Sequence, residues 1–366
     1  MAGREQQVLT LIRDDPMLPQ QAIAAKLGIS RSAVAGHIMN LTHKGLIKGR
    51  GYVLSDAPFV VVIGGANIDI HGKSANPLQS HDSNPGTVHT SAGGVARNIA
   101  DNLARLGIDS RLISAVGNDH HGQMLIRMSR DAGVNMHYVH QISSAPTSTY
   151  MSVLDESGDM SVAINDMSII NALTAEYLGP QKSMLAQSSL MILDCNLPDD
   201  TLEWLTRSFA STPIFVDTVS AAKAPRIKSY LHSVHTLKAS AIEIAALTGQ
   251  EARTRSQLRA IATQLHAEGV ERLFITRGEQ GVFYSTSDAQ GFETPSSGKR
   301  DILSTGGAGD AFLAGLAYSW LEDLSLKKAL RFAMAAADIT LSHPATNHPA
   351  LSVNTINNAM EQQRAG

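Results

Sequence analysis

From residue 59 onward, apolar and polar positions follow two alternating periods. Short runs rich in valine, isoleucine and leucine are typical of buried strands, and they are separated by longer segments whose apolar residues recur at helical spacing. This alternation predicts an α/β fold with a central, mostly parallel sheet. We expect its strands at residues 59–63, 112–116, 190–193, 214–216 and 273–276.

Two further β-rich runs interrupt this alternation. Residues 147–154 and 160–164 are separated by the turn sequence Glu-Ser-Gly-Asp at 156–159. Two strand-like runs joined by such a turn predict a hairpin. We expect this hairpin to form a small β-lid beside the main sheet.

The N-terminal residues carry a helical pattern instead. A helix is expected at 4–15 and ends before Pro16, and Gly28 separates a helix that starts at residue 20 from a second helix capped by Ser30. Residues 47–54 predict a short hairpin with a basic tip. The shared core of the two central helices is expected to consist of Ile23, Leu27, Val34 and Ile38.

This order of elements resembles the winged helix-turn-helix of bacterial transcription regulators. In that motif the second helix enters the major groove of DNA. The alternative is a small helical module that binds protein, but the basic, serine-containing face of the second helix favours DNA. The residues expected near DNA bases or phosphates are Ser30, Arg31, Ser32, His37, Lys48 and Arg50.

Charge divides the chain at the same place. Residues 1–56 hold seven basic and four acidic residues, whereas residues 57–366 hold 23 basic and 29 acidic residues. A basic head on an acidic body is typical of a nucleic-acid-binding appendage. The sequence therefore predicts two domains, 1–56 and 57–366.

Composition also limits the compartment. Cys195 is the single cysteine, so no intrachain disulfide can form. No signal segment opens the sequence, and no apolar run approaches the roughly 18–20 residues that span a membrane. We expect a cytoplasmic protein without a membrane partner.

One stretch near the C-terminus carries the strongest chemical signal, Ser-Thr-Gly-Gly-Ala-Gly-Asp at residues 304–310. With almost no side chains in the turn, the amides of Gly307, Ala308 and Gly309 can point together at an anion where a helix begins. Asp310 then stands where a carboxylate could take the proton of an attacking hydroxyl. The alternative is a tight strand-to-helix turn with an acidic cap.

Polar residues near the first strand form a second candidate group. Asn67 and Asp69 leave that strand through a glycine turn and are placed to bind vicinal sugar hydroxyls, although they could equally be turn residues. Gly93 and Gly94 open an amphipathic helix and let a ligand approach the backbone, and Asn98 lies one turn further on.

The two glycine motifs together resemble the signatures of the ribokinase-like (PfkB) carbohydrate kinases, over roughly residues 59–350. The resemblance implies a ribokinase-like domain with a β-lid, and transfer of the ATP γ-phosphate to a sugar hydroxyl with Mg²⁺. Within that family, six segments are most similar to the bacterial pseudouridine kinases, namely residues 65–69, 82–86, 93–98, 163–167, 194–196 and 235–238.

The resemblance also implies roles for single residues. Asp310 would be the base, with the amides of residues 307–309 as anion hole. The ribose would be held by Asn67, Asp69, Gly93, Gly94 and Asn98, and covered by the lid residues Thr149, Asn165 and Asp166. The nucleotide would be bound by Ser240, Glu243, Thr276, Gly278, Gly281 and Asn347, and Glu243 would organise the metal.

Two positions depart from the family pattern. Ser240 stands where an asparagine is usual, and Gly306 where a threonine is usual. They motivate an alternative, a transcription regulator whose kinase-like domain only senses a ligand, which the intact Asp310 argues against. A third reading keeps the kinase and changes the substrate to inosine, adenosine or ribose. A monovalent cation such as K⁺ and a homodimer are further expectations from the family.

Overall fold

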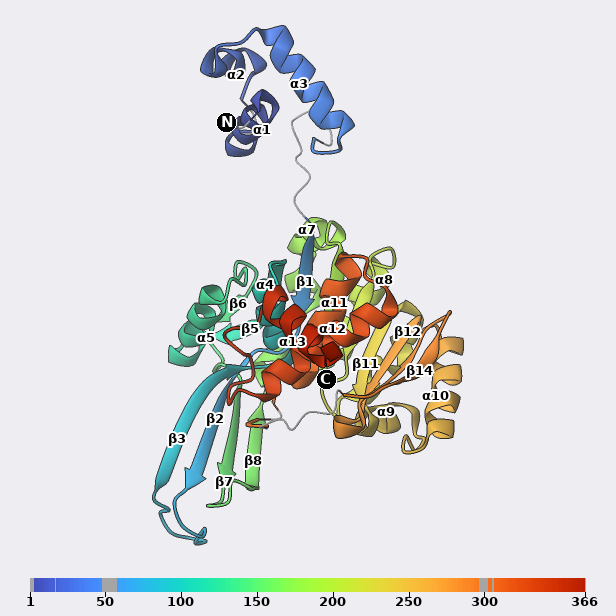
Figure 1. The fold of residues 1–366 in the computed structure, drawn as a ribbon. Helices are drawn as coiled ribbons and strands as arrows, with labels where there is room; N and C mark the ends of the chain where they lie inside the picture. Colours follow the sequence, from blue (N-terminus) through green and yellow to red (C-terminus); the bar gives the residue numbers. More distant parts are fainter. Residues whose placement is uncertain (1–2, 17, 48–57, 296–301, 305, 366) are drawn as a thin grey trace. The chain divides into compact units, whose positions relative to one another are not determined.

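The computed structural model describes residues 3–16, 18–47, 58–295, 302–304 and 306–365 (Figure 1). The chain divides into two compact units, Met1–Pro58 and Phe59–Gly366. No helix among these described residues is both long enough and apolar enough to cross a membrane.

The N-terminal unit consists of α1 (Arg4–Asp14), α2 (Gln20–Leu27) and α3 (Arg31–His43). Gly28 ends α2 in the left-handed conformation, and the Ser30 hydroxyl accepts a hydrogen bond from the amide of Ala33 to cap α3. Ile23 and Val34 are buried between the helices, and Leu27 and Ile38 pack against them. The predicted helix-turn-helix is confirmed, whereas most of the predicted hairpin at 47–54 lies outside the described residues.

The larger unit is built on an eight-stranded sheet. Its strands are β1 (Phe59–Ile63), β4 (Asp109–Ile113), β9 (Leu190–Asp194), β10 (Ile214–Asp217), β11 (Thr236–Ser240), β12 (Arg272–Thr276), β13 (Val282–Ser285) and β14 (Gln290–Glu293). They are arranged in the order β14-β13-β12-β11-β10-β9-β1-β4. The six strands from β12 to β4 are parallel. Strand β13 runs antiparallel to them, and β14, which is antiparallel to β13, runs in their direction.

Helices cover both faces of this sheet (Figure 1). The helices of this unit are α4 (Val95–Arg105), α5 (His120–Asp131), α6 (Ala175–Leu178), α7 (Lys182–Ala186), α8 (Asp199–Ser208), α9 (Ala241–Thr248), α10 (Arg255–Ala267), α11 (Ala308–Leu321), α12 (Leu326–Leu341) and α13 (Val353–Ala365), of which α13 packs on α12. Short 3₁₀ segments occur at η1 (Ser168–Ala172), η2 (Gly179–Gln181), η3 (Ala224–Ser233) and η4 (Gly278–Gln280).

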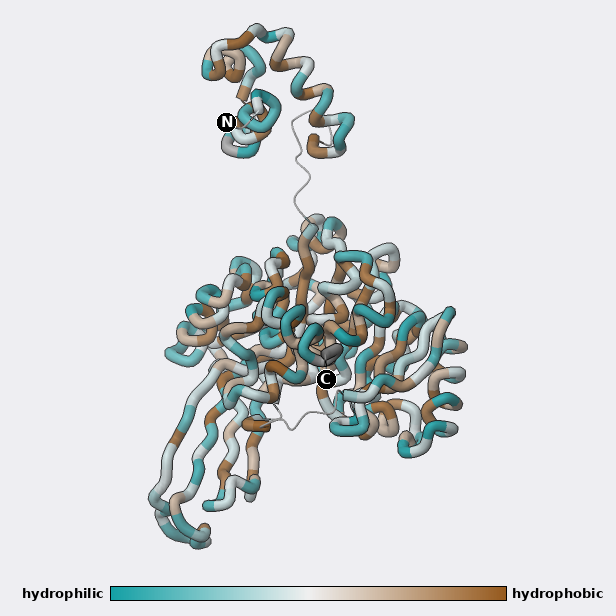
Figure 2. Tube along the Cα trace, viewed as in Figure 1, coloured by the Kyte–Doolittle hydropathy of each residue, from teal (hydrophilic) through white to brown (hydrophobic). Residues whose placement is uncertain are grey.

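Burial on both faces explains the continuous apolar runs of the strands, which Figure 2 shows in the centre of this unit. Val60 and Val62 of β1 pack with α4, α11 and α12, whereas Val61 and Ile63 pack with α8, α9 and α10. The carboxyl ends of β1 and β9 meet where the strand order reverses, which is where open α/β sheets bind their ligands.

A separate four-stranded sheet forms the lid. It consists of β2 (Asn67–Ser74), β3 (Gly86–Gly93), β7 (Thr149–Leu154) and β8 (Met160–Asp166), in the order β3-β2-β7-β8. The predicted hairpin is β7 and β8. The two other lid strands were not predicted, because their mostly polar residues carry little strand pattern, and β3 is largely exposed.

Other details also differ from the sequence prediction. The expected strand at 112–116 is divided, because the chain leaves the main sheet after β4 and β5 (Ala115–Gly117) pairs with β6 (His140–Ile142). Ser114 lies at the break, and its hydroxyl donates a 2.7 Å hydrogen bond to the Gly64 carbonyl. Strand β11 was not predicted, because Thr236, Lys238 and Ser240 interrupt its apolar character.

Candidate active site

The glycine-rich turn before α11 exposes backbone amides at the start of that helix. Gly307 is the N-cap, and its φ of 78° lies in the left-handed region that favours glycine. None of the described side chains caps this helix end, and the first N–H groups of a helix have no acceptor within it. The amides of Ala308 and Gly309 are therefore placed to donate to an anion.

Two of these glycines leave no room for a side chain. A Cβ at Gly307 would lie 1.8 Å from the carbonyl oxygen of Thr346, and a Cβ at Gly309 would lie 2.6 Å from Lys238 Nζ. At Gly306 the nearest atoms would be 3.5 Å away, which is ordinary contact. Packing therefore requires glycine at 307, and a methyl group at 309 would displace Lys238 Nζ, whereas packing would accept a methyl group at 306.

Asp310 lies in the first turn of α11 and is only 7% exposed. Asn98 of α4 donates a hydrogen bond of 2.8 Å from Nδ2 to Asp310 Oδ2. Burial and the nearby Asp217 raise the pKa of Asp310 to about 8, although Lys238 and the bond from Asn98 act in the opposite direction. A carboxylate with a pKa near neutral is suited to accept a proton from a hydroxyl.

A buried ion pair lies beside Gly309. Lys238 Nζ donates a 2.8 Å hydrogen bond to Asp217 Oδ2, and both side chains are almost inaccessible. Burial alone would lower the pKa of Lys238, but the carboxylates of Asp217, Glu243 and Asp310 outweigh burial and raise it. A fixed positive charge therefore adjoins the anion cradle.

Sequence reasoning assigned no role to this ion pair. The available signals were a lysine between the apolar Leu237 and Ala239, and an aspartate directly after the apolar run 214–216. Neither signal identifies the other partner, because the pairing depends on β10 and β11 being neighbours in the sheet.

Asp194 at the end of β9 was also missed. Its Oδ2 accepts hydrogen bonds from the amides of Gly65, at 2.8 Å, and Ala96, at 3.0 Å. One carboxylate thus joins the loop after β1 to the start of α4, although burial raises its pKa. Asp194 positions the two segments that carry the candidate sugar-binding residues.

Those residues meet at the base of the lid. Asn67 Nδ2 donates a 2.6 Å hydrogen bond to Asp69 Oδ1, and burial raises the pKa of Asp69 while this bond lowers it. A Cβ at Gly93 would lie 2.1 Å from Asp69 Oδ2. Gly94 has a φ of 98°, and a Cβ there would lie 2.5 Å from Ala66 Cα. Both glycines are therefore needed for this close approach.

Strand pairing separates the three lid residues. Asn165 lies opposite Tyr150, which is the neighbour of Asp69, so Asn165 and Asp69 share one face of the lid. Thr149 and Asp166 lie opposite each other on the other face. From the sequence, all three residues were expected to cover one ligand. This expectation is corrected, because adjacent residues of a strand point to opposite faces and only Asn165 shares the face of Asp69.

Ser240 and Glu243 form a capping box at the start of α9. The Ser240 hydroxyl accepts from the Glu243 amide at 3.3 Å, and Glu243 Oε2 accepts from the Ser240 amide at 2.7 Å. The same Oε2 accepts from the hydroxyl of Thr218 at 2.7 Å. Local bonds thus hold one carboxylate oxygen of Glu243 and the Ser240 hydroxyl.

The expected nucleotide loop follows β12. Thr276 pairs with Ser240 across β12 and β11, so the two residues lie at the same edge of the sheet. Gly278 and Gly281 follow with φ values of 57° and 81°, and a Cβ at Gly281 would lie 2.1 Å from the carbonyl oxygen of Glu293. The turn between β12 and β13 therefore depends on both glycines.

The side chain of Asn347 contacts residues of α4. Its amide oxygen accepts from Arg97 at 2.7 Å, and its amide nitrogen donates to the carbonyl of Asn98 at 2.9 Å. Arg97 in turn donates to the side-chain oxygen of Asn98 at 3.0 Å. Both ends of the Asn347 amide thus support Asn98, and the expected nucleotide role of Asn347 stays a prediction.

In the N-terminal unit, the expected DNA-contacting residues lie at the start of α3. Ser30 is its N-cap, and Arg31 and Ser32 follow in its first turn as exposed side chains. His37 lies further along the same helix and is half-buried. Lys48 and Arg50 lie outside the described residues.

Protein-family comparison matches two parts of the chain. The model described as "pfkB family carbohydrate kinase" matches residues 57–353. The model described as "Winged helix-turn-helix DNA-binding" matches residues 1–48.

Two curated relatives come from Escherichia coli (strain K12). The chain is 39% identical to the uncharacterized sugar kinase YeiI over 97% of its own length and 98% of that protein. It is 38% identical to a pseudouridine kinase over 84% of its own length and 98% of that protein.

Solved structures share the fold. A carbohydrate kinase from Agrobacterium tumefaciens superposes with a TM-score of 0.74 at 28% identity, covering 83% of this chain and 97% of that one. Ribokinase from Arabidopsis thaliana, solved with ribose and ATP, gives a TM-score of 0.76 at 23% identity, covering 84% of this chain and 99% of that one.

Proposed function

The chain belongs to the pfkB family of carbohydrate kinases, and on this premise we propose that it transfers the γ-phosphoryl group of ATP to the 5′-hydroxyl of pseudouridine. The observation that carries the proposal is the buried Asp310 carboxylate, held by Asn98 beside the uncapped start of α11. A base next to free amides is what an in-line transfer of a phosphoryl group to a hydroxyl requires.

In the proposed reaction, the 5′-hydroxyl loses its proton to Asp310 as its oxygen bonds to the γ-phosphorus. The bond between that phosphorus and the β,γ-bridging oxygen breaks, and ADP leaves. The amides of Ala308 and Gly309 stabilise the charge on the transferred group, and Lys238 beside Gly309 adds a fixed positive charge. Asp310 then holds the proton until product leaves.

Substrate choice rests on the lid and the residues at its base. Asn67 and Asp69 are proposed to bind the ribose hydroxyls, with Gly94 giving the sugar close access to the backbone. Asn165, on the same lid face as Asp69, is proposed to contact the base. Pseudouridine is the first candidate because a pseudouridine kinase is 38% identical to this chain.

The residues present fit a magnesium ion held mainly by phosphates and water. No cluster of three or more metal-binding side chains occurs among the described residues, and Mg²⁺ at kinase sites commonly uses only one or two carboxylates. Glu243 would supply one carboxylate. When bound, the ion neutralises charge on the β- and γ-phosphates.

A monovalent cation such as K⁺ is proposed as a further activator, and replacing K⁺ by tetramethylammonium in the assay tests it.

The first experiment measures ADP formation and product mass with ATP, Mg²⁺ and pseudouridine, uridine, inosine, adenosine or ribose. Preference for pseudouridine supports the proposal. If only another acceptor is phosphorylated, the chain is still a kinase, but the proposed substrate is wrong. Asp310→Ala should lower kcat by about 100- to 10 000-fold, with nucleoside affinity almost unchanged. The control Asp131→Asn alters an exposed carboxylate of α5. If no acceptor is phosphorylated, the kinase proposal is wrong.

The N-terminal domain supports a second activity, DNA binding. We propose that α3 enters the major groove, because this unit matches a DNA-binding winged helix-turn-helix and exposes Arg31 at the start of α3. Arg31→Ala should weaken binding to labelled duplex DNA and reduce the salt slope by about one. Arg13→Ala on α1 is the control. Equal loss in both variants would contradict this placement of α3.

We also propose that two copies pair through the lid and that the protein acts in the cytoplasm, where ATP is supplied. The lid face opposite Asp69 exposes four large apolar side chains, from Val88, Met151, Val162 and Ile164, with exposures of 42–70%. Such a patch is typical of an interface, and helix-turn-helix domains commonly bind DNA as dimers. Sedimentation velocity should show a dimer that Ile164→Lys converts to a monomer.

A further inference from the structure

A hollow of about 730 Å³ lies at the edge of the main sheet opposite to Asp310. We name it the amino-edge pocket, because it adjoins the residues at the amino ends of β11 and β12, with the β13–β14 turn and the last turn of α11 as its other walls. Asp310 and Trp320 lie ten residues apart on α11, about 15 Å along the helix. The pocket is therefore separate from the phosphotransfer site.

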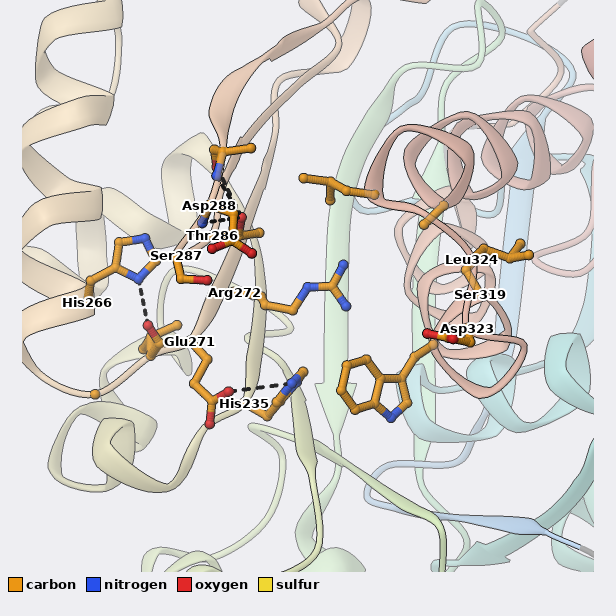
Figure 3. A pocket seen from close by; sticks show the side chains of 16 residues that line it. His235, His266, Glu271, Arg272, Thr286, Ser287, Asp288, Ser319, Asp323 and Leu324 are labelled. Carbon is orange, nitrogen blue, oxygen red and sulfur yellow. Dashed lines mark hydrogen bonds and ion pairs between the residues drawn. The ribbon is translucent and has the colours of Figure 1, made fainter.

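Arg272 is the central charge of this pocket. Figure 3 shows its side chain in the middle of the hollow, with Asp288 on one side and Ser319 and Asp323 on the other. Its guanidinium lies over the rings of Phe274, at 5.4 Å, and Trp320, at 5.7 Å. No hydrogen bond or ion pair joins it to another described side chain. Burial lowers the pKa of Arg272, so an anion would relieve an unpaired, half-buried charge.

An aromatic surface adjoins this charge. The rings of His235 and Trp320 are 4.4 Å apart, and His235 stacks on Phe215 with an interplanar angle of 4°. This packing holds Trp320 in place, yet 37% of its surface stays exposed. A fixed indole with an exposed surface can stack a planar ring at little conformational cost.

The rim of the pocket carries carboxylates, which are negatively charged and accept hydrogen bonds. Asp288 and Asp323 are exposed carboxylates, and Glu271 is exposed and lies 3.6 Å from His235. Solvent screens exposed charges, so they repel an anion at Arg272 only weakly. In dinucleotide-binding sites, a carboxylate accepts hydrogen bonds from the ribose hydroxyls of a ligand whose phosphate is bound nearby.

We propose that the amino-edge pocket binds a nucleoside monophosphate. Its phosphate pairs with Arg272, its base stacks on Trp320, and its ribose hydroxyls donate to Asp288 or Asp323. The guanidinium fork matches phosphate geometry, and the volume lies in the range usual for small-molecule sites. Inorganic phosphate has no base and could not stack on Trp320. A nucleoside has no phosphate and could not pair with Arg272.

The test uses the fluorescence of Trp320 in the full-length chain. The protein has two tryptophans, so Trp204→Phe leaves Trp320 as the single reporter. Uridine 5′-monophosphate should change the emission saturably, and uridine or inorganic phosphate should bind at least about tenfold more weakly, since each lacks one of the two main contacts. The proposal is overturned if emission shows no saturable change up to about 1 mM nucleotide, the weak end of specific binding.

Variants of Arg272 decide whether the pocket is the binding site. Calorimetry should show about tenfold or greater loss of uridine 5′-monophosphate affinity in Arg272→Gln, and a smaller loss in Arg272→Lys, which keeps the charge. Arg259→Gln removes an exposed arginine of α10 and should change nothing. Unchanged affinity in folded Arg272→Gln overturns the proposal. Asp310→Ala should retain this binding, which separates the pocket from the proposed kinase reaction.

Discussion

Asn98 and Asp310 are 212 residues apart in sequence, and the Asn98 amide donates a 2.8 Å hydrogen bond to the Asp310 carboxylate. The orientation of that amide is set from its other end, because Arg97 donates to the Asn98 oxygen at 3.0 Å and to Asn347 at 2.7 Å. The nitrogen of Asn98 must therefore face Asp310. A donor in that position stabilises the ionised form of a carboxylate, which is the form that acts as a base.

The rate of the reaction should depend on the ionisation of Asp310. Because burial and Asp217 raise its pKa to about 8, kcat/KM should increase with pH and level off above about 8. Asn98→Ala removes a bond that lowers this pKa, so the midpoint should move to higher pH. Steady-state rates measured between pH 6 and 10 provide the check, and a profile that is flat over this range would contradict the assignment of Asp310 as base.

The same group should link stability to pH. The folded-state pKa of Asp310 is raised above the unfolded value of 3.8, so the stability contributed by its neutral form is present below about pH 4 and is lost as pH rises through about 8. Asparagine at this position cannot ionise. The unfolding free energy of Asp310→Asn relative to that of the native chain should therefore increase with pH, and the increase should reach at least about 1.4 kcal/mol at pH 9. Urea unfolding at pH 5 and pH 9 measures this, and an equal difference at both values would refute the raised pKa.

Lys238 should be important for both stability and activity. Lys238→Met leaves the buried Asp217 without its partner, which should cost about 3–5 kcal/mol of unfolding free energy. It should also move the midpoint of kcat/KM to higher pH, because Lys238 lowers the pKa of Asp310.

A double-mutant comparison separates the ion pair from packing. Adding Asp217→Asn to Lys238→Met should restore part of the lost stability, because no buried charge then stays unpaired. Lys182→Met, at an exposed position of α7, is the matched control. A double variant as unstable as the sum of the two single variants would mean that the pair contributes only packing.

Neighbouring glycines in the phosphate turn should respond differently to alanine. Gly307→Ala forces a methyl group against the Thr346 carbonyl at a positive φ, so the turn must move. We expect at least about 3 kcal/mol of destabilisation and loss of activity. Gly306→Ala should be within about 1 kcal/mol of the native stability, because the nearest atoms lie at 3.5 Å. Thermal unfolding of both variants tests the contrast, which equal effects would refute.

The two faces of the lid should also differ. Asn165→Ala should raise the KM for the nucleoside by about tenfold, the effect of one lost polar contact, because Asn165 shares a face with Asp69. Asp166→Ala is the matched control, because Asp166 lies on the other face and accepts hydrogen bonds from Ser168. If Asp166→Ala raised KM and Asn165→Ala did not, the assignment of the substrate-facing side would be reversed.

Much of the fold was predictable because its signals are local. Strand β1 was predicted with the bounds it has, and the turn at Gly28 and the cap at Ser30 were both expected. Strand β11 was missed, because the polar residues Thr236, Lys238 and Ser240 look unlike part of a buried strand until Asp217 is known to pair with that lysine. The lid was predicted as one hairpin. Its other two strands, β2 and β3, were missed because their residues are mostly polar.

By itself the sequence determined the helices, strands and turns whose hydrogen bonds and periodicity are complete within a few residues. Its glycine motifs also indicated a phosphate-binding turn beside Asp310. Only the tertiary structure decided which distant groups meet. Asp194 reaches the start of α4 because β9 lies next to β1, and Asn98 reaches Asp310 because α4 packs against α11. Strand order and register create these contacts, and no short segment encodes them.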